Sequence, residues 1–66
     1  MTGEVKSYNP RTGYGFITSE GVDYFAHFSQ WQERVPFTKG LVVEFTPKET
    51  PKGIAATAIR IGGEHG

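Results

Sequence analysis

The chain has no cysteine, little leucine and no long apolar run. Without cysteine, neither a disulfide framework nor a thiolate metal site can support the fold. No segment reaches the roughly 20 apolar residues that a bilayer-spanning helix needs. The first residues carry no basic region followed by an apolar run, so we expect no signal peptide, no membrane contact and a cytoplasmic location.

An excess of positive charge is also missing, because Lys+Arg and Asp+Glu each number 7 and the formal net charge is zero. Proteins that hold duplex DNA mainly by neutralising phosphates are strongly basic, so this class is disfavoured. A single-strand binder is not excluded, because base stacking can supply much of its affinity. With 66 residues, the chain makes one domain with a thin core, and we expect its stability to be marginal.

What the chain does contain is glycine and aromatic residues in short stretches, a composition typical of strands and turns. We predict strands at residues 3–8, 14–19, 22–28, 41–46 and 54–61, turns at 9–13 and 20–21, a helical turn within 29–39 and a loop at 47–53. Strand edges must be paired or covered. The sequence therefore predicts an all-β, five-stranded antiparallel Greek-key barrel over residues 1–61, followed by a flexible tail at 62–66.

Aromatic residues recur on the second and third predicted strands. Residues two apart in a strand share a face, so Tyr14 and Phe16 point one way, and Phe25 and His27 share a face of the next strand. Antiparallel pairing would place these four rings side by side. The sequence alone leaves open whether they face the core or the solvent. If exposed, they would form a surface on which nucleobases stack.

His27 lacks the companions that catalysis or metal binding requires. The other histidine is His65 in the predicted tail, and no nucleophile stands at a fixed spacing from an orienting group. We therefore predict no enzyme, no catalytic residue, no metal and no cofactor, and interpret His27 as a further stacking ring. An enzyme would need the carboxylates of Glu4, Glu20 and Asp23 gathered in one cleft.

Two motifs carry a resemblance to a known family. Residues 12–17, Thr-Gly-Tyr-Gly-Phe-Ile, are similar to the first RNA-binding motif of cold-shock domains, Lys-Gly-Phe/Tyr-Gly-Phe-Ile. Residues 24–28, Tyr-Phe-Ala-His-Phe, are similar to the second motif, Val-Phe-Val-His-Phe. Weaker matches before and after them extend the resemblance over about residues 3–61, and the order and spacing of the two motifs make it specific.

The resemblance implies an oligonucleotide-binding (OB) fold that acts as a monomer on single-stranded RNA or DNA, with a preference for pyrimidine-rich strands. It also implies a role as an RNA chaperone or as a regulator of transcription or translation. The residues that it implies for stacking are Tyr8, Tyr14, Phe16, Phe25, His27, Phe28 and Trp31. Those that it implies for phosphate or polar contacts are Lys6, Arg11 and Lys52.

The sequence departs from the family pattern at two positions. Ser7 stands where the family carries tryptophan, and Thr12 stands where it carries lysine. Trp31 either restores the lost stacking area or packs in the core, and Phe37 is open to the same two interpretations. We expect the acidic side chains, Asp23 among them, to lie away from the rings or between strands. The departures keep a second interpretation open, a protein-interaction barrel with weakened nucleic-acid affinity.

Overall fold

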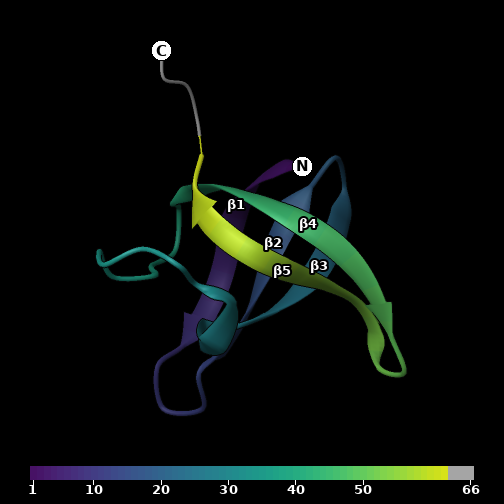
Figure 1. Ribbon diagram of the computed structural model, residues 1–66, viewed down its shortest axis with the longest axis horizontal. Coiled ribbons are helices and arrows are strands. Elements are labelled where there is room, and N and C mark those ends of the chain that lie inside the picture. The colour runs from purple at the N-terminus through teal and green to yellow at the C-terminus, as the bar shows by residue number, and fades with distance from the viewer. Residues whose placement is uncertain (63–66) are drawn as a thin grey trace.

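The computed structural model describes residues 1–62, which form β-strands joined by short connections (Figure 1). The elements are β1 (Thr2–Asn9), β2 (Tyr14–Ser19), β3 (Val22–His27), the 3-10 turn η1 (Phe28–Gln30), β4 (Val42–Thr50) and β5 (Gly53–Ile61). Within this part of the chain, no helix is long and apolar enough to cross a membrane. Of the predicted tail, Gly62 donates its N–H to the carbonyl of Val42, and residues 63–66 lie outside the described residues.

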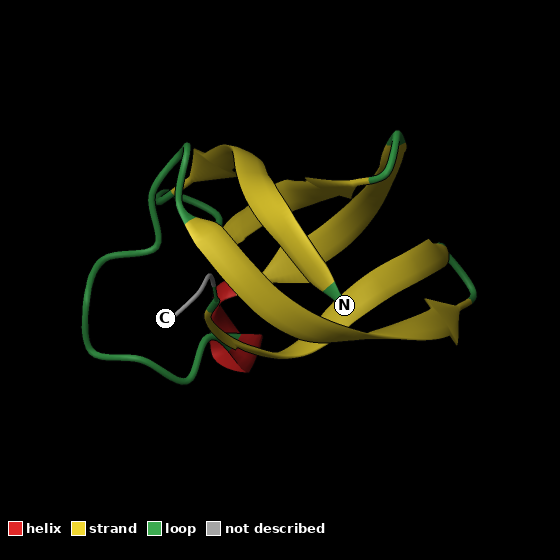
Figure 2. Ribbon diagram, turned by 90° about the horizontal axis from the view of Figure 1, so that it is seen from above, coloured by secondary structure: helices red, strands yellow, loops and turns green. Residues whose placement is uncertain are grey.

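The strands close into a barrel in the order β1-β2-β3-β5-β4, which confirms the predicted fold class (Figure 2). Four of the five neighbouring pairs are antiparallel, and β3 pairs with β5 in parallel through Phe25↔Ala55 and Ala26↔Ala56. Strand directions cannot alternate all the way around a ring with an odd number of members. One parallel pair is therefore the geometric consequence of closing five strands, and closure pairs the start of β4 with β1.

Burial alternates along β2 and β3 as the predicted strand period requires. Ile17 and Ala26 face the interior, at 0% and 1% exposure, and the four rings lie on the outer side. This settles the orientation that the sequence left open. The buried apolar core consists of Val5, Ile17, Tyr24, Ala26, Trp31, Phe37, Val43, Phe45, Ala56 and Ile59.

Three predicted boundaries are corrected by the structure. β3 ends at His27, and the helical turn starts at Phe28, one residue before the predicted segment. The predicted loop at 47–53 is mostly strand, since β4 runs through Pro47 to Thr50. After Glu44, β4 is paired with β5 alone, so a proline with no N–H is tolerated on its open side.

Trp31 and Phe37 both belong to the core, so the structure corrects the prediction that Trp31 extends the stacking path. Trp31 is only 8% exposed, and its Nε1–H donates to the carbonyl oxygen of Val35 at 2.7 Å. Its ring centroid lies 5.1 Å from that of Phe37. A buried indole satisfied by a backbone acceptor fills the interior and offers no free face to a base.

Gly15 lies inside β2, where the backbone of β1 lies close against it. A Cβ at this position would overlap the Ser7 carbonyl oxygen and would lie 3.0 Å from the Cα of Tyr8. The register of β1 against β2 shifts between Val5 and Ser7, next to this contact. The crossing of the two backbones therefore requires a residue with no side chain.

We predict that Gly15→Ala lowers the free energy of unfolding by about 2–3 kcal/mol, because the added methyl group must push two backbones apart. Gly21→Ala is the matched control. Gly21 has a φ of 81° and no atom within 4 Å of an added Cβ. Only backbone strain should therefore lower the free energy of unfolding there, by about 1 kcal/mol. Urea unfolding followed by circular dichroism measures both. Equal losses for the two variants would contradict the steric role of Gly15.

Candidate nucleic-acid interface

The pairing of β2 with β3 gathers four rings on the outside of the barrel. Tyr14 lies opposite His27, and Phe16 lies opposite Phe25. Tyr14 is stacked on Phe25 with centroids 4.8 Å apart and meets His27 edge-on at 4.5 Å, while Phe16 meets Phe25 edge-on at 5.8 Å. Tyr14 is 41% exposed and Phe16 is 42% exposed. We call these four residues the ring surface.

Two further aromatic residues flank the ring surface. Phe28, at the start of η1, is 51% exposed, and its N–H donates to the carbonyl of Gly13 at 2.7 Å. Tyr8 is half-buried, and its ring meets Phe37 edge-on at 5.1 Å. Phe28 therefore offers a free ring face beside the 9–13 turn, whereas part of the Tyr8 ring packs against the core.

His27 has a structural contact in addition to its place among the rings. Its Nδ1 accepts the N–H of Ser29 at 3.1 Å and lies 2.8 Å from the Ser29 hydroxyl, so the side chain caps η1. Because Nδ1 accepts a hydrogen bond, a neutral His27 ring carries its proton on Nε2. The same side chain thus fixes the start of η1 and contributes a ring to the outer surface.

A groove of about 500 Å³ runs between the ring surface and the β4–β5 hairpin. We call it the hairpin groove. Its lining residues are Tyr14, Phe25, His27, Ser29, Gln30, Lys48, Thr50, Pro51, Lys52, Ala55, Ala56 and Thr57. Lys52 is one of the predicted contact residues, whereas Lys48 and Gln30 are not among them. A strand face could be read from the polar residues two apart at Thr46, Lys48 and Thr50. Pro47 and Pro51, however, favour a loop in the sequence analysis.

On the other side of Tyr14 there is a smaller hollow of about 330 Å³ at the β1–β2 end. Its lining residues are Ser7, Tyr8, Asn9, Thr12, Tyr14, Gly15 and Phe16. The two positions that depart from the family pattern, Ser7 and Thr12, both line it. Small side chains at these positions leave open space beside Tyr14 and Phe16.

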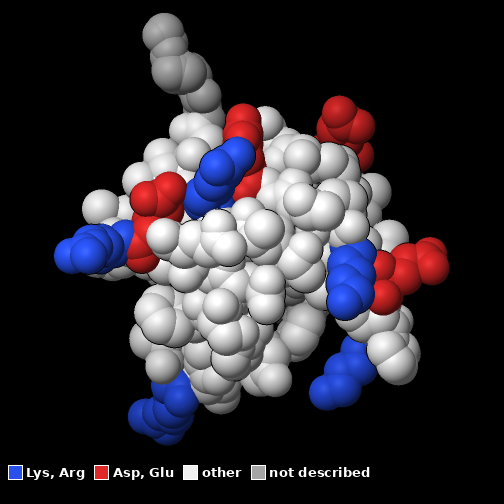
Figure 3. Space-filling view, in the orientation of Figure 1, with Lys and Arg blue, Asp and Glu red and all other residues white. Residues whose placement is uncertain are grey.

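The predicted basic contacts are dispersed. Lys6 does not stand free, because its Nζ forms an ion pair of 2.8 Å with Asp23. Asp23 is thus in contact with one of the residues that the resemblance implies for phosphate contact. Arg11 is exposed in the 9–13 turn, and the Lys and Arg side chains on the β4–β5 face stand around an uncharged centre (Figure 3).

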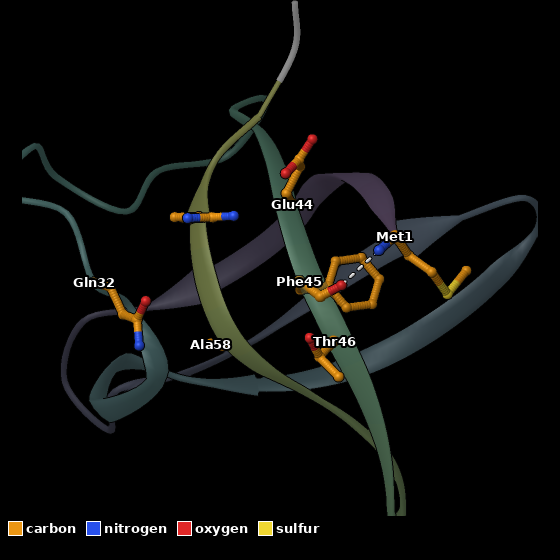
Figure 4. Close-up of a pocket in the computed structure, with 7 residues that line it drawn as sticks. Met1, Gln32, Glu44, Phe45, Thr46 and Ala58 are labelled. Carbon is orange, nitrogen blue, oxygen red and sulfur yellow. Dashed lines mark hydrogen bonds between the residues drawn. The ribbon is translucent and has the colours of Figure 1, made fainter.

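A third hollow, of about 380 Å³, lies on β4 and β5 and shares no lining residue with the other two (Figure 4). Across it, the amino group of Met1 donates to the carbonyl oxygen of Phe45 at 2.6 Å. Glu44 and Arg60, which are paired in register, also line it. The ring of Phe45 is buried, so this hollow offers no stacking face.

Within residues 1–62, no group of three or more His, Asp or Glu side chains is placed to hold a metal ion. Asp23 contacts Lys6, and none of the three hollows described above is lined by Glu4, Glu20 or Asp23. The arrangement that would have favoured an enzyme is therefore not found in these hollows.

Comparison with known proteins gives consistent results. Residues 1–61 match the family described as the "'Cold-shock' DNA-binding domain". The chain is 45% identical over 64 residues to the cold shock-like protein CspA of Bordetella pertussis, covering 91% of this chain and 96% of that protein. It is 43% identical over 63 residues to the cold shock-like protein CspI of Escherichia coli, covering 89% and 90%.

A solved structure, titled drosophila Unr CSD456, superposes with a TM-score of 0.77. The two chains are 22% identical, and the match covers 94% of this chain but 26% of the solved one. At this identity the likeness shows a shared fold and nothing finer.

We predict that His27→Ala loosens η1, because Ser29 loses its acceptor. The amide of Trp31, which donates to Phe28 at 2.9 Å within this turn, should exchange with solvent about fivefold faster, as expected for loss of a helix cap. His27→Asn is the control, since its side-chain oxygen can cap the same N–H. NMR hydrogen exchange reports both. Unchanged exchange at Trp31 in the alanine variant would show that the cap is not needed.

Proposed function

This chain belongs to the cold-shock domain family, whose members generally bind nucleic acid, and from that premise we propose that it binds single-stranded RNA or DNA by stacking bases on the ring surface. The observation that carries the proposal is the gathering of Tyr14, Phe16, Phe25 and His27 on the outer side of β2 and β3. Unpaired bases present the flat faces that such rings accept.

Exposed aromatic rings have an energetic cost that a partner can remove. Isolated apolar side chains are common on protein surfaces, but a contiguous patch of them marks a site of interaction. Here Tyr14 and Phe16 each leave more than two fifths of their surface in solvent, and Phe28 continues the patch at the start of η1. Each base that stacks on such a ring contributes about 1–3 kcal/mol, without regard to sequence.

The charges support a mode in which stacking outweighs phosphate contacts. The net charge is zero, and Lys6 is engaged by Asp23 in an exposed ion pair, which by itself is worth about 0–1 kcal/mol. Lys48 and Lys52 line the hairpin groove, and Arg11 lies in the turn before Tyr14. Among residues 1–62 none of these three cations forms a salt bridge, so each is available to phosphates that run beside the stacked bases.

Capture of unpaired bases gives the protein a way to act on folded RNA. A protein that binds the open form of a hairpin and not the closed form shifts their equilibrium by mass action, with no need for ATP. We propose that this chain acts in this way, as an RNA chaperone or as a regulator of transcription or translation.

One observation favours a second candidate, a barrel that binds proteins. The Lys6–Asp23 pair, together with Ser7 and Thr12 at family contact positions, reduces the number of groups available to nucleic acid. Titration with an oligonucleotide separates the two candidates.

We predict that Phe16→Ala weakens binding of a labelled heptathymidine about tenfold, by loss of one stacked base. Val22→Ala is the control, since Val22 is equally exposed at the other end of β3. Fluorescence anisotropy of the labelled strand is the suitable measurement, because Trp31 is buried and its emission is a poor reporter. No change in anisotropy for the wild-type protein at high micromolar concentration would refute single-strand binding and favour a protein partner.

We further predict that Lys48→Gln lowers the slope of log affinity against log salt by about 0.7, the value for one phosphate contact on a single strand. Lys39→Gln makes the same change of charge at an exposed position that lines neither the hairpin groove nor the hollow at the β1–β2 end. Its slope should equal that of the wild type. Equal slopes for all three proteins would show that Lys48 makes no phosphate contact.

A further inference from the structure

We propose that the hollow at the β1–β2 end holds the ribose of one nucleotide and makes the protein favour RNA over DNA. Ser7 and Asn9 are the residues that would recognise the 2′-hydroxyl group. The inference rests on the proposed function, because it requires a single strand whose bases stack on the ring surface. Ser7 is one of the two positions at which the chain departs from the family pattern, and it lines this hollow.

Ser7 and Asn9 lie directly beside two exposed rings. In the pairing of β1 with β2, Ser7 is opposite Phe16 and Asn9 is opposite Tyr14. Residues opposite each other in an antiparallel pair share a face, with Cβ atoms about 4.5–5.5 Å apart. All four side chains are exposed. A nucleotide whose base stacks on Phe16 or Tyr14 therefore meets polar groups on the β1 side of the ring.

The orientation of the Asn9 amide is set by the turn that follows it. Its Oδ1 accepts the N–H of Arg11 at 2.9 Å, while its backbone carbonyl accepts the N–H of Gly13 at 2.8 Å. The reverse orientation of the amide would set the NH₂ group against the Arg11 N–H, donor against donor. Because Asn9 lines the hollow, its NH₂ group is the donor that it offers there.

The hydroxyl group of Ser7 supplies a partner of a different kind. It is exposed and can rotate, so it can accept a hydrogen bond as well as donate one. The backbone that carries it is held in place, because the Ser7 carbonyl oxygen lies against Gly15. The tryptophan of the family pattern would present an apolar ring at this position, whereas Ser7 presents a hydroxyl group and open space.

The third hydroxyl group of the hollow that could contribute is already used within the turn. Thr12 Oγ1 accepts the N–H of Tyr14 at 3.3 Å and lies 3.4 Å from the carbonyl oxygen of Asn9. Ser7 and Asn9 are therefore the side chains to which a polar ligand in the hollow would bind.

The chemistry of the hollow fits a sugar better than a phosphate. None of its lining residues is charged, whereas phosphates are held mainly by cations. The ring surface takes the faces of the bases, so the sugar is the neutral polar part of the nucleotide that remains. A ribose 2′-hydroxyl group both donates and accepts, and it is the group by which a protein distinguishes RNA from DNA. It would accept from the Asn9 NH₂ group and donate to the Ser7 oxygen.

A cation stands at the same end of the sheet for the adjoining phosphate. Arg11 is exposed in the 9–13 turn and precedes Thr12, which lines the hollow. Deoxyribose would leave Ser7 and Asn9 hydrated, since both are exposed, so the preference for RNA should be modest.

The test compares a heptauridine RNA with hepta-deoxyuridine by anisotropy of the labelled strands. The two have the same bases and the same phosphates and differ in the 2′-hydroxyl groups. We expect the wild-type protein to bind the RNA about fivefold more tightly, the effect of roughly one hydrogen bond. Ser7→Ala should lower this ratio below about twofold, because the oxygen that accepts from the ribose is lost. Ser7→Thr retains the hydroxyl group and should keep the preference.

Ser29→Ala is the matched control, because it removes the same hydroxyl group from the hairpin groove, on the other side of Tyr14. It should keep the wild-type ratio, since any loss at the His27 cap affects both strands alike. Ser7→Trp provides an independent check. Its ring fills the hollow, so the affinity for both strands should rise by stacking while the ratio falls.

The outcomes separate the ribose site from the proposed function. Equal affinity of the wild-type protein for both strands, tighter binding of the DNA strand, or an unchanged ratio in Ser7→Ala would overturn the role of the hollow. Each of these results would leave single-strand binding intact. If neither strand binds, the proposed function itself fails, and the ribose site fails with it.

Discussion

The close crossing of β1 and β2 at Gly15 is the constraint on which the rest of the structure depends. A side chain on Gly15 would strike the backbone of Ser7, so β1 and β2 can lie this close together only because this residue has none. Its neighbours Tyr14 and Phe16 must then point to the other side of the strand. The position that allows the barrel to close is thus also the position that turns two aromatic rings toward solvent.

The interior beneath the rings is correspondingly narrow. Gly15 pairs with Ala26, and Ala26 pairs with Ala56, so a row of small buried residues crosses β2, β3 and β5. Larger side chains, Trp31 and Ile59 among them, fill the barrel elsewhere. Small residues inside and large rings outside invert the usual arrangement of a strand pair. Under the proposed function, a bound single strand would cover the rings and offset that cost.

The proposed interface belongs to a chain with zero formal net charge. Lys6 is paired with Asp23, and the free cations near the rings come from the 9–13 turn and from the β4–β5 hairpin. The hairpin brings Lys48 to the groove only because β4 continues through Pro47. The groups proposed for stacking and for phosphate contact thus lie on different elements, which the closed barrel holds together.

The sequence by itself determined the number and order of the strands, the pairing of Tyr14 and Phe16 with the rings of β3, and the family, because strand period and motif spacing are local properties of the chain. It did not determine which face was buried, since alternation fixes two opposite sides without saying which is inside. Nor did it place Trp31, whose ring suits a core or a surface equally well. The tertiary structure decided both, because closing the barrel left an interior that Trp31 and Phe37 help to fill, while the ring surface lies outside it.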